Sequence, residues 1–193
     1  FDKIEKTINC PKIIIDNRKA SFLATEHLIK NGYNKILHFR EGFQPQIAID
    51  RYLGYRDTLD KYKITFDKER VFVCENVDEI SGFLDAKKAF KSGIKFDGLF
   101  AFTDYAAIGA IQFFKSDKIS IPKDILVVGF SNRKVTRFTT PTVSTVDQSA
   151  FLVGKNIFKA FLEEKLPRNK SDPPANNVLK IPTNLIVRES SDI

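Results

Sequence analysis

Four apolar segments of the sequence each end in a pair of polar residues, and these pairs carry the groups best suited to chemistry. The pairs are Arg40–Glu41, Glu75–Asn76, Thr103–Asp104 and Ser131–Asn132. If the segments are strands of an open parallel sheet, their carboxyl ends meet at one edge, which is where such sheets bind ligands. Hydroxyl, amide and carboxylate groups match the hydroxyls or amides of a polar small molecule. The sequence therefore predicts a polar small-molecule cleft.

Arg51 is a further candidate because it lies near the start of a helix predicted from about 48 to 62. Its planar guanidinium can bind vicinal hydroxyls or a carboxylate through two hydrogen bonds at once. A surface or ion-paired arginine would show the same spacing, so both interpretations remain open. Asp104 is also ambiguous, since it either only caps the helix that follows it or caps that helix and faces the cleft.

The elements that must position these residues alternate along the chain. Strands are predicted at 12–16, 34–39, 70–75, 96–102 and 124–130, and helices begin near residues 17, 48, 81 and 104. Such alternation is typical of an α/β protein with a parallel sheet covered by helices on both faces. We expect Asp16 to cap the first helix. The pattern changes after Phe130, where we expect a crossing segment (139–148), a helix (151–164), a surface connection (166–177) and an extended end (177–190).

Composition and the absence of catalytic motifs argue against an enzyme or a metal-binding protein. The 193 residues are 42% hydrophobic and 28% charged, and the formal net charge of +7 comes from scattered lysines typical of a solvated surface. Phosphate-loop, nucleophile-elbow and zinc-protease motifs are missing, so we expect no enzyme activity, cofactor or metal. His27 and His38 are predicted to pack in the core. Cys10 and Cys74 are predicted to be unpaired thiols.

The chain starts at Phe1 and contains no methionine. We interpret it as a piece of a longer protein, or as a string from which methionines are missing.

Six motifs in a fixed order carry a family resemblance. They are DNRKASFLATEHLIKNGYNKILHF, DRYLGYRDTL, FDGLFAFTDYAAIGAIQFFK, IPKDILVVGFSN, TTPTVSTVDQ and LIVRES. Together they resemble the effector-binding domain of the lactose/galactose-repressor (LacI/GalR) family of bacterial transcription regulators. The resemblance implies a periplasmic-binding-protein-like type I fold, with two Rossmann-like lobes around a cleft. It assigns 1–15 to the end of the N-terminal lobe, 16–145 to the C-terminal lobe, 146–166 to a crossover and N-terminal-lobe helix, and 167–193 to the return.

The resemblance also implies which residues bind effector. Arg51 matches an arginine that contacts sugar hydroxyls, and we expect its replacement by alanine to abolish effector binding while leaving the fold intact. Asp104 matches a second contact position, and Thr103 before it stands where an asparagine is common. Ser131 and Asn132 fall at a third, where many members have an aspartate in place of Ser131.

Three positions on the effector side depart from the family pattern. Val77 stands where several members have an aromatic residue, and Pro45 and Ile47 where others have polar contacts. These departures, with Ser131 in place of a common aspartate, make a hexose-type effector doubtful.

The implied partners are a small effector, a second copy of the chain through Ile108 and Thr139, and operator DNA. The DNA would be bound by a helix-turn-helix outside this chain, in a cytoplasmic protein without membrane contact. Ile108 equally suits the core of its own lobe. Effector would shift the population of lobe arrangements and so change DNA binding. Two alternatives are a periplasmic sugar-binding receptor of a transporter and an α/β enzyme acting on a nucleotide or sugar.

Overall fold

The computed structural model describes residues 12–42, 45–165 and 178–193, without the side chains of 163–165. Its elements, in order, are β1 (Lys12–Ile15), α1 (Asn17–Lys30), β2 (Ile36–Glu41), α2 (Gln46–Lys61), η1 (Lys68–Arg70), β3 (Val71–Cys74), α3 (Glu79–Lys91), β4 (Gly98–Ala101), α4 (Asp104–Ser116), β5 (Leu126–Phe130), η2 (Lys134–Arg137), β6 (Ser144–Asp147), α5 (Ala150–Lys165), β7 (Val178–Ile181) and β8 (Asn184–Ile186). The predicted α/β alternation is confirmed. The predicted surface connection at 166–177 lies outside the described residues, as does Cys10.

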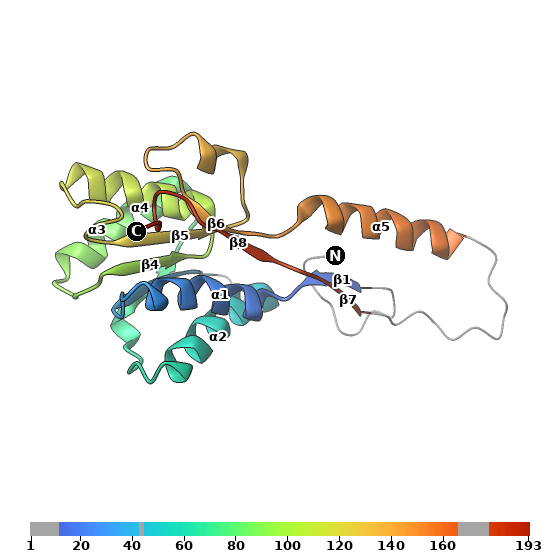
Figure 1. The fold of residues 1–193 in the computed structure, drawn as a ribbon, viewed down its shortest axis with the longest axis horizontal. Helices are drawn as coiled ribbons and strands as arrows, with labels where there is room; N and C mark the ends of the chain where they lie inside the picture. Colours follow the sequence, from blue (N-terminus) through green and yellow to red (C-terminus); the bar gives the residue numbers. More distant parts are fainter. Residues whose placement is uncertain (1–11, 43–44, 166–177) are drawn as a thin grey trace.

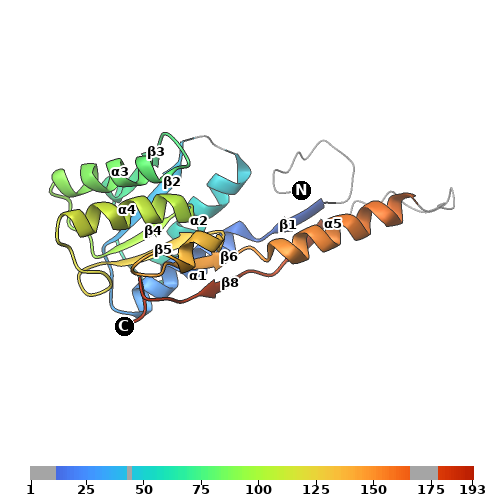
Figure 2. The same cartoon turned by 90° about the horizontal axis from the view of Figure 1, so that it is seen from above.

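A six-stranded sheet forms the body of the molecule, in the order β3-β2-β4-β5-β6-β8. All neighbours are parallel except β6 and β8, which pair antiparallel. The helices α1 and α2 cover one face and α3 and α4 the other (Figure 2). Strand β4 is buried throughout, whereas the edge strand β3 is only partly buried.

Side-chain caps fix where three helices begin. The backbone N–H of Lys19 donates to Asp16 at 3.1 Å, which confirms the predicted cap of α1. Asp78 accepts from Ser81 N at 2.8 Å and caps α3 in the same way. At α4 the cap is Thr103, whose hydroxyl accepts from Ala106 N at 3.2 Å. The prediction that Asp104 caps this helix is therefore wrong.

A second, smaller unit extends from the body (Figure 1). It consists of β1 and β7, which pair parallel, and of α5. All three of its links to the body are short: β1 leads into α1, β6 into α5, and β7 into β8. The segment 139–148, predicted to cross between the units, contains β6, which pairs parallel with β5 in the main sheet.

Candidate functional site

The carboxyl end of β5 holds the most constrained backbone near the predicted cleft. Ser131 has φ 119° and Asn132 has φ 50°, both in the left-handed region that non-glycine residues rarely occupy. Such strain persists only where surrounding contacts enforce it, and it is common at ligand-binding sites. We therefore expect surrounding contacts to hold the turn after β5 in this conformation.

Three consecutive backbone N–H groups hold this turn in place. Ser131 N donates to Val146 O at 2.9 Å, and Asn132 N donates to Thr145 Oγ1 at 3.1 Å. Arg133 N donates to a carboxylate oxygen of Asp104 at 2.7 Å. Strand β6 and the start of α4 thus fix the turn from two sides.

Asp104 lies beneath the turn and is fully buried. Its second oxygen accepts from Thr145 Oγ1. Burial raises the pKa of Asp104, while the Thr145 and Arg133 hydrogen bonds oppose that rise. A Cβ on Gly129 would lie 2.5 Å from Asp104 Oδ1, so the glycine admits the carboxylate. Asp104 is therefore a positioning residue for the turn, not a group exposed in the cleft.

Arg188 is a second side chain that supports the turn. Its guanidinium donates to Asn132 Oδ1 at 2.8 Å, to Val143 O at 2.6 Å and to Thr136 Oγ1 at 3.1 Å. Asn132, predicted to contact effector, uses its side-chain oxygen within the protein. Sequence reasoning did not single out Arg188, although it lies in the closing VRES motif.

Arg51 lies under the same edge of the sheet and is 6% exposed. Its Nε donates to Asn17 Oδ1 at 3.0 Å and its Nη1 to Phe102 O at 2.7 Å. The guanidinium carbon lies 3.8 Å from the centroid of the Phe130 ring. The interpretation of Arg51 as a surface residue is wrong. Its removal would leave two buried oxygens without their donor, so we now expect Arg51→Ala to cost stability as well as effector binding.

Ser131 connects the sheet edge to the smaller unit. Its hydroxyl accepts from Gln148 Nε2 at 3.2 Å. Gln148 follows β6, and since β6 runs parallel to β5, its side chain emerges at the same carboxyl edge. Sequence analysis missed Gln148 because it treated 139–148 as a crossing segment rather than a strand.

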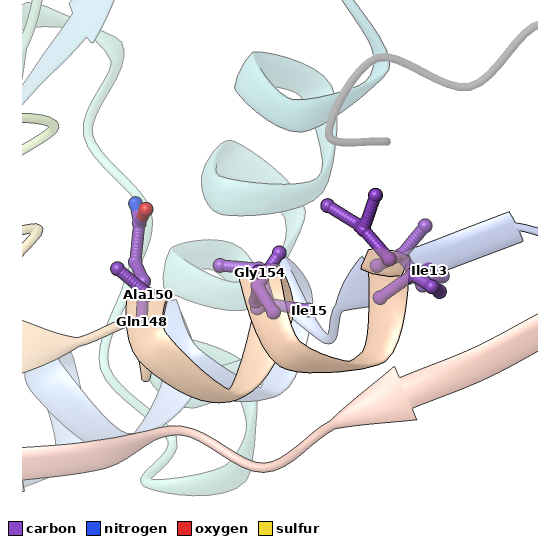
Figure 3. A pocket seen from close by; sticks show the side chains of 8 residues that line it. Ile13, Ile15, Gln148, Ala150 and Gly154 are labelled. Carbon is purple, nitrogen blue, oxygen red and sulfur yellow. The ribbon is translucent and has the colours of Figure 1, made fainter. Parts of the chain in front are cut away.

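Gln148 also lines a groove of about 300 Å³ between β1 and α5. The other lining residues are Ile13, Ile14, Ile15, Ala150, Val153, Gly154 and Ile157. Figure 3 shows the Gln148 amide pointing away from the α5 ribbon, at the end of the groove nearest the body. The groove is apolar apart from this amide, so it supplies contact area rather than recognition of polar groups.

The remaining predicted residues lie elsewhere or are only partly available. Thr103, at the end of β4, is partly exposed and uses its hydroxyl oxygen as the cap of α4. Val77 is 45% exposed after β3, which is three strands from β5, or about 14 Å at usual strand spacing. The structure therefore brings Arg51, Thr103, Asp104, Ser131 and Asn132 together but leaves Val77 apart.

The predicted dimer positions differ in exposure. Ile108 is 8% exposed and belongs to the core between α3, α4 and the sheet, which favours the core alternative. Thr139 is partly exposed and donates to Pro141 O at 2.8 Å.

The histidines and the described cysteine behave as packing residues. His38 is fully buried and stacks between Tyr55 and Phe100, with both ring centroids 4.9 Å away, as predicted. His27 is only half-buried, and its Nε2 lies 2.8 Å from Ser191 Oγ. Cys74 is buried, and burial raises the pKa of its thiol. Within 12–42, 45–165 and 178–193, no cluster of three or more acidic, histidine or cysteine side chains is arranged to hold a metal ion. No helix in these ranges is long and apolar enough to cross a bilayer.

Comparison with known proteins identifies the class. The family model of the periplasmic binding protein-like domain matches residues 25–191. The purine-repressor homologue of Vibrio atlanticus, an HTH-type transcriptional repressor (PurR), is 30% identical over 79% of this chain and 45% of its own. A solved but uncharacterized protein from Actinobacillus succinogenes is 28% identical, with a TM-score of 0.87 over 98% of this chain and 67% of its own. A sugar-binding transcriptional regulator of the LacI family from Escherichia coli shares the fold at 23% identity, with a TM-score of 0.82 over 98% of this chain and 66% of its own.

The chain thus has the fold of a periplasmic binding protein-like domain. It belongs to that family as an effector-binding domain of the lactose/galactose-repressor type. It spans about half the length of the curated relatives it matches.

Proposed function

We propose that this chain is the ligand-sensing part of a bacterial transcription regulator and that it binds a small polar effector at the carboxyl edge of the main sheet. The observation that carries the proposal is the turn at Ser131 and Asn132, which hydrogen bonds hold at positive φ. The Gln148 amide connects this turn to the smaller unit by its hydrogen bond to Ser131. The binding groups are the Ser131 hydroxyl, the Gln148 amide, Thr103 and the guanidinium of Arg51. Asp104, Asn132 and Arg188 position them.

The effector lies between two lobes, of which this chain contains one in full. In this proposal the six-stranded body, which includes all of β6 and β8, is the C-terminal lobe. The smaller unit of β1, α5 and β7 belongs to the N-terminal lobe. Exposed apolar side chains on α5 support this division, since Phe151, Phe158 and Phe161 are 82%, 63% and 53% exposed. Faces this apolar are usually covered in the complete protein.

Effector acts on DNA binding through the connections at β1–α1 and β6–α5. A ligand that contacts Ser131 on one side and the smaller unit on the other binds one lobe arrangement better than another. Only this difference in affinity shifts the equilibrium. The protein is a cytoplasmic homodimer that binds operator DNA through a segment outside this chain. It is not an enzyme and needs no cofactor.

The dimer contact involves the surface next to Thr139 rather than Ile108 itself. Ile108 contributes to the core of its own lobe, whereas Phe138, beside Thr139, is 83% exposed. An exposed phenylalanine of this kind is a common anchor of a protein interface. Replacing Phe138 by serine lowers the fraction of dimer in analytical ultracentrifugation of the full gene product, while Lys134→Ser, on the same loop, does not.

The experiment that tests the proposal is to read the gene on the 5′ side of the Phe1 codon and to measure DNA binding of its product. An in-frame helix-turn-helix, with retention of the product on DNA, supports the regulator. A secretory signal peptide there would support the alternative, a periplasmic sugar-binding receptor, and would overturn the DNA part of this proposal.

A further inference from the structure

A second cluster of positive charge lies beside the candidate site, on the α2 face of the sheet. Arg40 is the last residue but one of β2, and Tyr52 and Arg56 lie one helical turn apart on α2. The guanidinium carbon of Arg40 is 4.8 Å from the centroid of the Tyr52 ring, and that of Arg56 is 6.0 Å from the same centroid. Both guanidinium groups therefore lie beside the same ring, close enough for one small molecule to contact both.

Neither cation has a carboxylate partner in the part of the chain that the structure describes. The ion pairs found there involve other cations, among them Arg18 with Asp57 and Arg70 with Asp67. Arg56 donates from Nη1 to Tyr52 Oη at 3.3 Å, a neutral acceptor. The Nε atoms of Arg40 and Arg56 are buried without a hydrogen-bond partner among the described residues. Two guanidinium groups that share one ring repel each other, and an anion between them would remove that cost.

Aromatic rings hold the two arginines in fixed positions. Arg56 lies 3.8 Å above the Phe66 ring, and Tyr52 contacts Phe66 edge to face at 6.4 Å. An arginine side chain that already packs on an aromatic ring loses less conformational entropy when it binds a ligand. The two guanidinium groups are therefore pre-organised to bind an oxyanion. Both side chains are partly exposed, so solvent reaches the cluster.

The cluster is close to the proposed effector site but separate from it. A series of rings lies between them: the His38 ring is 6.2 Å from Tyr52 and 4.9 Å from Phe100. Phe100 is in turn 6.4 Å from Phe130, the ring that Arg51 contacts. Arg51 itself donates to Asn17 and to Phe102 O.

We propose that Arg40 and Arg56, together with the hydroxyl of Tyr52, form a binding site for an oxyanion, a phosphate or carboxylate group of a small molecule or the free ion. The site does not depend on the proposed regulatory function. It makes the region between β2, α2 and Phe66 a place where a negatively charged metabolite binds in preference to a neutral one.

Thermal unfolding of the full gene product at constant ionic strength tests the proposal, with inorganic phosphate, acetate and chloride as probes. Phosphate is expected to raise Tm saturably, and chloride is not. Arg40→Gln and Arg56→Gln should each raise the half-saturating phosphate concentration at least tenfold. Arg18→Gln is the matched control, since Arg18 is also an exposed arginine on this face but is paired with Asp57, and it should leave that concentration unchanged.

Two further arms make the result decisive. Ribose 5-phosphate compared with ribose separates an anion carried by a small molecule from a free ion: half-saturation below that of inorganic phosphate indicates the former, and equal values the latter. If Arg40→Gln fails to fold, as judged by circular dichroism, Arg40→Lys keeps the charge but loses the fork and should weaken binding several-fold. The proposal is overturned if phosphate stabilises no more than chloride, or if both arginine variants respond as wild type does.

Discussion

The carboxylate of Asp104 accepts a hydrogen bond from the backbone N–H of Arg133 at 2.7 Å, across 29 residues of sequence. This contact joins the start of α4 to the end of the turn that carries Ser131 and Asn132. Because both turn residues have positive φ, the turn needs such a restraint. The geometry of the proposed effector site therefore depends on a residue that does not touch effector.

Replacement of Asp104 by alanine removes the acceptor for Arg133 N and Thr145 Oγ1. We expect the free energy of unfolding to fall by about 3 kcal/mol, since one buried and one partly buried donor lose their charged partner. Asp104→Asn keeps one acceptor and should cost about 1 kcal/mol. Urea denaturation of both variants measures the difference. Equal, small losses in the two variants would show that Asp104 does not hold the turn.

Gly129→Ala tests the same contact from the opposite side. The new Cβ would lie 2.5 Å from Asp104 Oδ1, closer than packing allows. We expect a loss of about 1–3 kcal/mol, typical of overpacking, and weaker effector binding as the turn shifts. Gly154→Ala, where nothing lies within 4 Å of the added Cβ, is the control and should not destabilise the protein. A tolerated Gly129→Ala variant would contradict the close approach.

Asn17→Ala is expected to release Arg51 without removing its charge. The Nε of Arg51 loses its acceptor, so the guanidinium is positioned only by Phe102 O and the Phe130 ring. Effector affinity should fall about tenfold, because one orienting hydrogen bond contributes about 1–1.5 kcal/mol. Isothermal calorimetry measures this loss. Asn34→Ala, whose side chain caps a surface turn, is the control. Unaltered affinity in Asn17→Ala would mean that Arg51 needs no positioning.

His38 makes stability depend on pH. Burial lowers its pKa from 6.5 to about 3, so the folded protein keeps this ring neutral where the unfolded chain binds a proton. Its contribution is fully present above pH 6.5 and is lost as pH falls toward 3, by about 1.4 kcal/mol per pH unit. His38→Phe retains the stacking on Tyr55 and Phe100 but cannot titrate. Denaturation at pH 7.5 and 5.0 should show a smaller loss for His38→Phe than for wild type. Parallel losses would contradict the assignment.

The sequence predicted the fold and one part of the site well, because those depend on local patterns. Apolar segments that end in polar pairs located the carboxyl ends of β4 and β5, and so Thr103, Asp104, Ser131 and Asn132. The pattern could not show which of these groups face solvent. Asp104 is buried because Gly129 admits it, and Asn132 is engaged by Arg188, 56 residues away. Such long-range contacts have no periodic signal.

Strand order explains where Gln148 and Val77 lie, and it cannot be read from chain order. Gln148 was not predicted for this reason, and Val77, assigned by the family resemblance, stays a prediction. Strand β6 joins the sheet beside β5 and brings Gln148 to Ser131, whereas β3 forms the far edge and carries Val77 away. Arg51 was assigned to the cleft by its helical position, but its burial depends on Asn17, which lies on a different helix.

The central claim is that a small polar molecule binds at the Ser131 and Arg51 edge of the sheet. Its most direct test is a thermal-shift screen of the full gene product against sugars, nucleosides and purine bases, repeated with Ser131→Val and Arg51→Lys. We predict that at least one compound raises Tm by several degrees in wild type and that both variants lose most of this shift. A compound that stabilises wild type and both variants equally would contradict the claim.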